Sequence, residues 1–503
     1  MPRSAEDREF VLPTRMEQVS LQRWLYGELR GAILNGRLTP GARLPSTRDL
    51  AQQYKVARGT VTIAYDQLAA EGYLTASVGR GTFVEQKLPE SLAQGRSQRP
   101  RSSSGVNRRA SAIRLADSGA ALAQKEFPLA GRKRLEAAFR VGQPDLVNFP
   151  IDVWTRIAAR RIHAAERLLL ADGDARGYEP LRREIASRLR SARGISCTAD
   201  QIVVVGSVQQ ALDLVARLLL EPRDLVWVEE PGYPPARRLL EAAGARLVNI
   251  PVDLRGIDPT IGQRCGPGAR LVLVTPTRQA PLGMPLSLER RLALLRLADE
   301  SNTFIFEDDY DGEFRFRDRP LAALKALDQA DRVIYAGTFS KVLFPALRLA
   351  YVVLPHTLVS PFVMAWSSTS RHAPLLNQCI LHDFMAEGHF GRHVRRMRQM
   401  YASRLEALDA AAQAYWSGML QLMPHDAGLD VAAIACEQQL DDITLSATAA
   451  DAGLEIMPLS PWFAKKSTRQ PGVVLGFAAV RENEIRKAAQ LLGRALTGLK
   501  RGE

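Results

Sequence analysis

Residues 333–353 read VIYAGTFSKVLFPALRLAYVV and hold one lysine between two apolar segments. The segments Val333–Tyr335 and Leu349–Val353 are short and rich in β-branched and aromatic residues, which predicts two buried strands. Lys341 lies between them beside Ser340, in a chain that has ten lysines and 57 arginines. A lysine at the end of a buried strand, among so few lysines, is therefore a candidate for chemistry.

The sequence before this stretch alternates short apolar strands with amphipathic helices. Further strands are predicted at Ile202–Val205, Leu225–Val228, Ala245–Ile250, Leu271–Val274 and Phe304–Phe306, and helices at Gln209–Leu220, Ala236–Ala243 and Leu288–Asp299. Such alternation predicts an α/β fold with a largely parallel sheet. Sheets of this kind bind ligands beyond the carboxyl ends of their strands.

Polar residues follow several of these predicted strands, and together they supply what pyridoxal phosphate requires. The cofactor needs an amine to form a Schiff base, an anion beside the pyridine nitrogen, a donor to the ring hydroxyl and a cup for the phosphate. Lys341 is the candidate for the amine and the catalytic residue, Asp308 for the partner of the pyridine nitrogen, and Tyr310 for the ring hydroxyl. The remaining cofactor-binding candidates are Thr338, Ser340, Arg348 and Ser207 for the phosphate, and Tyr233 as a wall of the pocket.

The first part of the chain predicts a winged helix-turn-helix. Apolar residues recur at helical spacing from Leu21 to Leu34, a second helix begins after Ser46, and a third covers Ala57–Glu71. The strands Tyr73–Ser77 and Thr82–Val84 follow as a hairpin. Two helices joined by a tight turn and followed by a hairpin indicate a protein that binds double-stranded DNA. The candidate DNA-binding residues are Arg43, Arg48, Arg58, Thr60 and Arg80.

The chain is expected to contain two domains joined by a linker. Residues 88–115 are rich in Ser, Arg, Gly and Gln and lack sustained apolar periodicity, which is typical of a linker. The predicted DNA-binding domain covers 1–87, the linker 88–115 and the large domain 116–503. The first 115 residues hold 18 Lys+Arg against 10 Asp+Glu, so the predicted DNA-binding domain and the linker together carry most of the net charge of +13.

The composition excludes several classes of protein. Hydrophobic residues make up 46% and charged residues 24%, values of a globular rather than a disordered or fibrous chain. No apolar run approaches the roughly 18 residues that a membrane helix needs, and the N-terminus is too polar for a secretory signal. We therefore expect a cytoplasmic protein without a membrane partner. Four separated cysteines without a C-x-x-C pair favour reduced thiols over a disulfide framework or a metal site.

Two parts of the sequence carry a family resemblance. The stretch LRGAILNGRLTPGARLPSTRDLAQQYKVARGTVTIAYDQLAAEGYLTASVGRGTFV resembles the winged-helix domain of the GntR superfamily of bacterial transcription regulators. The stretches FEDDYDGEFRF and YAGTFSKVLFPALRLAYVVLP resemble fold-type I aminotransferases, and the combination resembles the MocR subfamily of GntR regulators. The resemblance implies a homodimer that binds operator DNA. It also implies that pyridoxal phosphate on Lys341 senses an amine, an amino acid or the cofactor itself.

Two motifs depart from the family pattern. This chain has Arg278-Gln279-Ala280-Pro281-Leu282-Gly283 where the family usually has His-Gln-Phe-Pro-x-Gly and catalytic aminotransferases have Asn-Pro-x-Gly. Ala280 has no side chain to hydrogen-bond the ring hydroxyl, which argues against efficient transamination. Val208 likewise replaces an expected hydroxyl in the phosphate loop. The resemblance also implies a substrate-carboxylate arginine near the C-terminal strand predicted at Val473–Phe477, for which Arg469 is the nearest candidate in the sequence.

Three functions stay open on the sequence alone. The favoured one is a transcription regulator that depends on pyridoxal phosphate. The second is a working aminotransferase with an accessory DNA-binding domain, which predicts turnover with an oxo-acid acceptor. The third is a regulator whose large domain has lost the cofactor and serves as a scaffold, and the presence of both Lys341 and Asp308 argues against it.

Overall fold

The structure, a computed structural model, describes residues 20–77, 80–86, 88, 114–123, 137–164, 171–316, 322–424, 426–465 and 468–501. The chain divides into two compact units, Met1–Ala112 and Ile113–Glu503, and each has a hydrophobic core of its own. Most of the predicted linker at 88–115 lies outside the described residues, as do two residues of the predicted hairpin turn, Val78 and Gly79.

The first unit is a winged helix. Its helices are α1 (Leu21–Leu34), α2 (Thr47–Gln53) and α3 (Arg58–Ala70), and its antiparallel hairpin consists of β1 (Leu74–Ser77) and β2 (Gly81–Val84). The Ser46 hydroxyl accepts a hydrogen bond from the Asp49 amide at 3.2 Å, so α2 is capped as its sequence predicts. Apolar side chains of these helices and of the hairpin meet in one core. The predicted winged helix is therefore confirmed.

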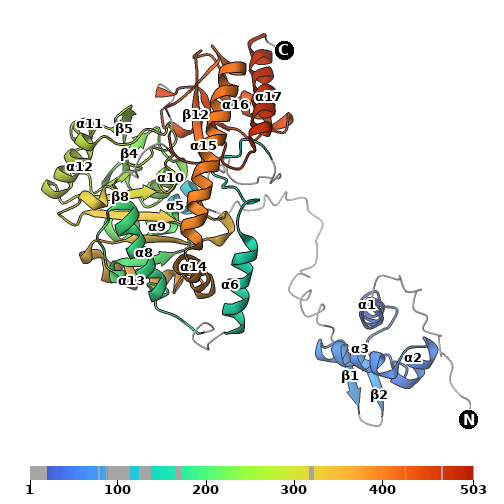
Figure 1. The fold of residues 1–503 in the computed structure, drawn as a ribbon. Coiled ribbons are helices and arrows are strands. Elements are labelled where there is room, and N and C mark those ends of the chain that lie inside the picture. Colours follow the sequence, from blue (N-terminus) through green and yellow to red (C-terminus); the bar gives the residue numbers. More distant parts are fainter. Residues whose placement is uncertain are drawn as a thin grey trace, which may run out of the picture. The chain divides into compact units, whose positions relative to one another are not determined.

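The second unit is built on a large sheet, of which Figure 1 labels β4, β5 and β8. Within the described residues the strand order of this sheet is β3-β10-β9-β8-β7-β4-β5-β6. Its strands are β3 (Ile202–Val205), β4 (Leu225–Glu230), β5 (Arg246–Asp253), β6 (Gly256–Ile257), β7 (Leu271–Val274), β8 (Phe304–Asp309), β9 (Val333–Thr338) and β10 (Ala350–Val353). The strands β4, β5, β7, β8 and β9 are parallel, whereas β10 is antiparallel to both of its neighbours. The predicted α/β fold with a largely parallel sheet is confirmed.

Four strands, β4, β5, β8 and β9, extend further at their carboxyl ends than their apolar pattern predicts, and two of them bear on the site. β8 runs to Asp309 and β9 to Thr338, so polar residues predicted to follow these strands belong to them. Asp308 pairs with Ala336 of β9 in the parallel ladder. Because the ladder fixes the backbone of Asp308, the direction of its side chain is set by the pleat of the sheet.

Helices pack against the large sheet, and alternate residues of its strands enter two different cores. Ile202 and Val204 of β3 belong to one core, whereas Val203 and Val205 belong to the other. The helices of this part are α5 (Asp117–Leu122), α6 (Ile151–His163), α8 (Glu179–Arg193), α9 (Val208–Leu219), α10 (Pro234–Ala242), α11 (Pro259–Cys265), α12 (Leu288–Glu300), α13 (His356–Ser370) and α14 (Leu375–Ala386). None of the helices in the described segments is long and apolar enough to cross a membrane.

The C-terminal part forms a second, antiparallel sheet with the order β11-β12-β14-β13. Its strands are β11 (Leu420–Leu422), β12 (Asp430–Ala435), β13 (Met457–Pro458) and β14 (Gly472–Gly476), and its helices are α15 (His389–Trp416), α16 (Asp442–Asp451) and α17 (Glu482–Arg501). Only the strand near β14 is predicted from the sequence. Of the others, β11 and β13 are three and two residues long, and alanine, which strands disfavour, makes up half of the six residues of β12.

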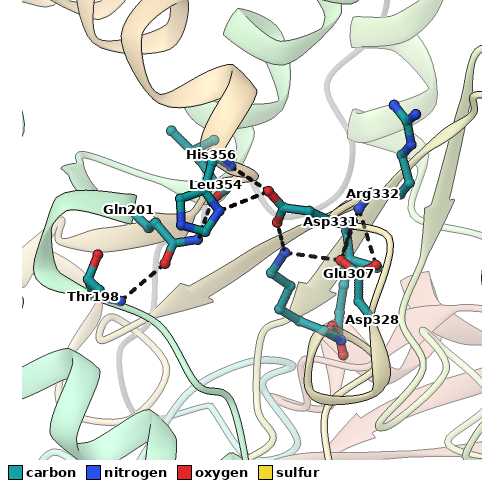
Figure 2. A network of polar contacts seen from close by, with 10 residues as sticks. Thr198, Gln201, Glu307, Asp328, Asp331, Arg332, Leu354 and His356 are labelled. Atoms are coloured by element: carbon teal, nitrogen blue, oxygen red, sulfur yellow. Dashed lines mark hydrogen bonds and ion pairs between the residues drawn. The ribbon is translucent and has the colours of Figure 1, made fainter.

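At the amino edge of the large sheet, a buried lysine is held between two carboxylates (Figure 2). Lys325 Nζ lies 3.0 Å from Asp328 Oδ2 and 2.8 Å from Asp331 Oδ1, just before β9 begins. Asp331 Oδ2 also accepts a hydrogen bond from the His356 amide at 2.6 Å, just after β10 ends. These contacts join the segment before β9 to the residue that follows β10, so this edge of the sheet has a structural role.

Candidate functional site

A cavity of about 260 Å³ lies at the opposite, carboxyl edge of the large sheet and is lined by residues of both sheets. The residues predicted to hold the cofactor all line it: Ser207, Tyr233, Asp308, Tyr310, Thr338, Ser340, Lys341 and Arg348. The other lining residues are Val141, Val208, Gln209, Thr275, Arg278, Ala280, Pro281, Asp430, Met457, Trp462 and Val474. The structure therefore brings the predicted cofactor residues together in one place.

Lys341 lies in the turn that follows β9. The Ser340 amide donates a hydrogen bond to Thr338 Oγ1 at 3.1 Å within this turn, and Lys341 Nζ donates one to the Gly142 carbonyl oxygen at 3.0 Å. Gly142 has φ +70°, and a Cβ atom at this position would collide with Lys341 Nζ, so a side chain would displace the amine. The sequence gives no signal for Gly142, because its role depends on a contact across 199 positions of the chain.

Two adjacent aspartates at the end of β8 have opposite environments. Asp309 Oδ2 lies 2.6 Å from Arg193 Nη2 and accepts a hydrogen bond from the Tyr335 hydroxyl at 2.6 Å, in a buried ion pair. Asp308 lines the cavity, and its Oδ1 is buried without a hydrogen-bond partner among the described residues. Asp309 Oδ1 also lacks a partner among the described residues, but Asp309 does not line this cavity and its other oxygen is paired with Arg193. A buried carboxylate oxygen without a donor is unfavourable, so Asp308 is the member of the pair that is available to a ligand in this cavity.

The surroundings of Asp308 change its ionisation. Burial, with the nearby carboxylates of Asp309, Asp311 and Glu229, raises the pKa of Asp308 to about 7, and the charge of Lys341 opposes this shift. A cationic donor at the unpartnered oxygen would favour the ionised carboxylate and lower the pKa again. The site therefore favours a ligand that presents a protonated nitrogen to Asp308.

The raised pKa of Asp308 predicts that stability depends on pH in protein without cofactor. In the unfolded chain the pKa is 3.8, so the folded state binds more protons between that value and about 7. The contribution of Asp308 to stability is therefore full below pH 3.8 and is lost as the pH rises through about 7. Asp308→Asn should reduce the loss of unfolding free energy between about pH 5 and about pH 8 by about 1 kcal/mol or more.

Urea titrations of wild type and variant at both pH values measure this difference. Burial also raises the pKa of Glu229 and of Glu307 to about 7, and these groups contribute to both proteins, so comparison with the variant isolates Asp308. An unchanged pH dependence in Asp308→Asn would show that the Asp308 carboxyl is already ionised at low pH.

Arg278 occupies the first position of the motif that departs from the family pattern, and its side chain is buried. Its Nη1 donates a hydrogen bond to the Tyr310 hydroxyl at 2.8 Å and to Asp311 Oδ2 at 3.1 Å. Its Nε donates to the Ala427 carbonyl oxygen at 3.1 Å, and its Nη2 donates to the Asp430 carbonyl oxygen. Burial raises the pKa of Tyr310 well above its ordinary value, and the positive charge of Arg278 opposes that rise. Arg278 therefore fixes the Tyr310 hydroxyl at the cavity wall, a role that the sequence does not predict.

The part of the cavity predicted to hold phosphate combines a helix N-terminus with an arginine. The Ser207 hydroxyl caps α9 by accepting a hydrogen bond from the Gln210 amide at 3.1 Å, and the first two residues of α9 line the cavity. Arg348 directly precedes Leu349 and β10. Because β10 is antiparallel to β3 and β9, its amino end lies at their carboxyl edge, which brings Arg348 to the cavity. Helix N-termini and guanidinium groups are both suited to phosphate.

The C-terminal sheet gives the cavity an apolar wall. Val474 of β14 pairs with Met457 of β13, and both line the cavity together with Trp462. Arg469, the candidate for a substrate carboxylate, is not among the cavity-lining residues of the described chain. The Nε atom of Arg469 is buried and has no hydrogen-bond partner among the described residues. The role of Arg469 stays a prediction.

In the first unit, the predicted DNA-binding residues lie on the helices and the hairpin of the winged helix. Arg48 lies on α2, Arg58 and Thr60 lie in the first turn of α3, and Arg80 lies in the hairpin turn. Arg43 precedes α2, and its guanidinium lies against the hairpin. Arg48, Arg58 and Arg80 are exposed, and the amino end of α3 has no side-chain cap. Exposed arginines and a free helix N-terminus fit contacts with phosphates and base edges.

The residues of the cavity fit pyridoxal phosphate. The decisive observation is the buried Asp308 Oδ1, which among the described residues lacks the donor that a protonated pyridine nitrogen supplies. The amine of Lys341 and the hydroxyl of Tyr310 line the same cavity, as do Arg348 and the start of α9. These are the groups that the chemistry of this cofactor requires.

Comparison with known proteins identifies two families in the chain. Residues 138–442 match the family "Aminotransferase class I and II", and residues 21–84 match "Bacterial regulatory proteins, gntR family". The chain is 37% identical to the probable rhizopine catabolism regulatory protein MocR of Rhizobium meliloti, over 96% of this chain and 95% of that protein. It is 31% identical to the pyridoxine biosynthesis transcriptional regulator PdxR of Corynebacterium glutamicum, over 93% and 94% of the two chains.

Solved structures similar to this chain include aminotransferases. An archaeal alanine:glyoxylate aminotransferase matches with a TM-score of 0.70 and 25% identity, over 76% of this chain and 98% of its own. The α-aminoadipate aminotransferase LysN of Thermus thermophilus matches with a TM-score of 0.70 and 26% identity, over 77% and 98%. The LysN structure contains N-(5'-phosphopyridoxyl)-L-leucine. Both matches cover nearly the whole enzyme and leave part of this chain outside.

Proposed function

The chain belongs to the MocR type of GntR transcription regulators, which bind DNA, and we propose that its large unit uses pyridoxal phosphate to sense an amine. Lys341 holds the cofactor and Asp308 binds its pyridine nitrogen. Tyr310 donates to the ring hydroxyl, from a position that Arg278 fixes. The residues that bind the phosphate are Ser207, Thr338, Ser340 and Arg348, and Tyr233 forms a wall beside the ring.

The signal in this proposal is the release of Lys341. When bound, pyridoxal phosphate supplies an aldehyde carbon that forms a Schiff base with one amine at a time, so an effector amine takes the place of Lys341. The released ammonium group has the Gly142 carbonyl oxygen as an acceptor. Gly142 precedes α6, whereas Lys341 follows β9, so the release alters a contact between distant parts of the large unit. Different packing of the two states would change operator affinity by about 1–3 kcal/mol.

The observation that carries this proposal is the unpartnered Asp308 Oδ1 in the same cavity as Lys341. The test titrates the protein, loaded with pyridoxal phosphate, with amines while absorbance and operator affinity are measured in the same samples. We expect the cofactor absorbance to change over the range of amine concentration that changes operator affinity. A change in operator affinity at constant absorbance would exclude amine exchange as the signal. Turnover of an oxo acid would instead support the rival, a working aminotransferase with an accessory DNA-binding domain.

We also propose that the protein is a homodimer. Leu146 and Val147 lie in the segment before α6 and Ile151 is its first residue, and their exposed fractions are 40%, 76% and 58%. Three exposed apolar side chains of this size within six residues of the chain favour a protein partner over solvent. Light scattering should give a mass twice that of one chain, and Val147→Asp should lower it towards the monomer. A monomeric wild type would contradict this part of the proposal.

Arg58→Ala is expected to weaken operator binding by about 1–3 kcal/mol, because Arg58 lies in the first turn of the helix expected to enter the major groove. The side chain is exposed, and its hydrogen bond from Nε to Thr47 Oγ1 is long, at 3.4 Å, so DNA can displace this bond. Fluorescence anisotropy on operator and scrambled DNA measures the change. Arg37→Ala is the control, because Arg37 follows α1 and lies 4.0 Å from Glu28. An equal loss on both DNA sequences would assign Arg58 to a phosphate contact.

A further inference from the structure

We infer that the effector of this cavity is an amine without a carboxylate group, which instead presents a hydrogen-bond donor to Asp430. The donor is a hydroxyl or a second ammonium group. This inference rests on the proposed function, since it names the chemical class of the amine that replaces Lys341. It follows from the charges that line the cavity and from the contacts that each of them already makes.

The arginines of the cavity wall are not available to a carboxylate on the effector, because one is paired within the protein and the other is assigned to the phosphate. Among the described residues, Arg278 and Arg348 are the arginines that line the cavity. Arg278 is buried, donates to Tyr310, Asp311 and two carbonyl oxygens, and is neutralised by Asp311 at 3.1 Å. Arg348 lies at the end of the cavity that holds the capped start of α9, where the phosphate is proposed to bind. A carboxylate on the effector would therefore find neither guanidinium available to it.

The wall of the cavity that faces the effector is apolar. A carboxylate group on the effector would need a cation at this wall. Val474 lies between Met457 and Ala432 in the C-terminal sheet, and Val474 and Met457 line the cavity. Ala280 and Val141 continue this wall, and all four cavity-lining residues belong to one apolar cluster. An ionised carboxylate placed against these side chains would lose its hydration without gaining a partner.

Asp430 is a carboxylate at the same wall. It is the first residue of β12, is 8% exposed and lines the cavity. Its Oδ1 accepts a hydrogen bond from the Gly142 amide at 2.5 Å, and the carbonyl oxygen of Gly142 accepts from Lys341 Nζ at 3.0 Å. Asp430 therefore contacts the amide of Gly142, and the amine of Lys341 contacts the carbonyl oxygen of the same residue. A donor a few bonds from the effector nitrogen is in position to reach Asp430, whereas a carboxylate there would be repelled.

The test compares four amines of equal chain length on protein loaded with pyridoxal phosphate: propylamine, 3-amino-1-propanol, 1,3-diaminopropane and β-alanine. The cofactor absorbance gives an apparent Kd for each, corrected for the fraction of free amine at the assay pH. We expect the amino alcohol and the diamine to bind at least about tenfold more tightly than β-alanine, with propylamine between them, since one good polar contact accounts for about tenfold in affinity. Binding of β-alanine as tight as that of propylamine would overturn the inference.

Asp430→Asn separates charge from shape, because asparagine keeps the Oδ1 acceptor for the Gly142 amide. We expect the variant to lose most of the preference for the diamine over propylamine and to keep the affinity for propylamine within about twofold. Equal weakening of both amines would contradict recognition by Asp430. Loss of β-alanine binding in Arg469→Ala, with the other amines unaffected, would show that Arg469 turns into the cavity and would also overturn the inference. A cofactor absorbance that none of the four amines changes would overturn the proposed function itself.

Discussion

Lys341→Ala is expected to abolish the absorbance of the protein-bound Schiff base while the protein stays folded. The side chain is half-buried in a preformed turn, and its removal takes away the hydrogen bond to the Gly142 carbonyl oxygen. Pyridoxal phosphate would still contact Asp308 and the phosphate end of the cavity, so weak, noncovalent binding should remain. We expect the Kd for the cofactor to rise about 100-fold, which corresponds to the loss of about 2.7 kcal/mol.

Two control variants make the result for Lys341 specific. Lys341→Arg keeps a positive charge at the same position but has no amine that can form a Schiff base, so it should also lack the absorbance. Lys487→Ala removes an exposed lysine on α17 and should leave the spectrum unchanged. Circular dichroism shows whether each variant is folded. A normal cofactor spectrum in Lys341→Ala would remove Lys341 from its assigned role and with it the proposed sensing mechanism.

The second large effect is expected from the two aspartates of β8, which should respond in opposite ways to the same substitution. Asp309→Asn removes the charge that pairs with Arg193 and leaves a buried guanidinium without its counter-ion, and both side chains are 3% exposed. Breaking a buried pair from one side costs about 3–5 kcal/mol. We therefore expect a large fall in the unfolding free energy of the large unit, measured by urea titration.

Asp308→Asn should leave this stability unchanged or raise it slightly at neutral pH, because it removes a buried carboxylate whose Oδ1 has no partner among the described residues. Its effect should instead appear in cofactor binding. Loss of the charge beside the pyridine nitrogen is expected to raise the Kd for pyridoxal phosphate about 10- to 100-fold. If the two variants exchanged these effects, Asp309 rather than Asp308 would bind the cofactor.

Much of the candidate site could be predicted from the sequence because of a rule of topology. In a parallel sheet, residues that follow different strands meet at one edge, whatever their separation in the chain. Ser207, Asp308 and Lys341 each stand at the end of an apolar segment, so the strand pattern alone brings them together. The capped start of α2 and the hairpin of the first unit could be predicted for a similar reason, since caps and turns have local sequence signals.

The residues that could not be predicted depend on long-range contacts or on exact strand length. Gly142 and Asp430 reach the cavity from segments without clear periodicity. Val474 lies in a predicted strand, but its place in the cavity wall depends on the pairing of that strand with Met457 and Ala432. The distinction between Asp308 and Asp309 depends on how far β8 continues past Phe306, because successive residues point to opposite faces. The apolar pattern stops at Phe306, so periodicity alone leaves both aspartates in a loop and gives no physical reason for the choice of Asp308 over Asp309.

The reversed direction of β10 has a consequence for how this protein can change over evolutionary time. Ala350 of β10 pairs with Thr338 of β9 on one side and with Val205 of β3 on the other. The segment that links β9 to β10 is therefore fixed at both ends. In the proposed function, this segment carries both Lys341, which holds pyridoxal phosphate, and Arg348, which binds its phosphate group. A single inserted residue would displace Lys341 and Arg348 together. We therefore expect the length of this segment to be constant among homologues that keep pyridoxal phosphate and to vary among homologues that have lost it.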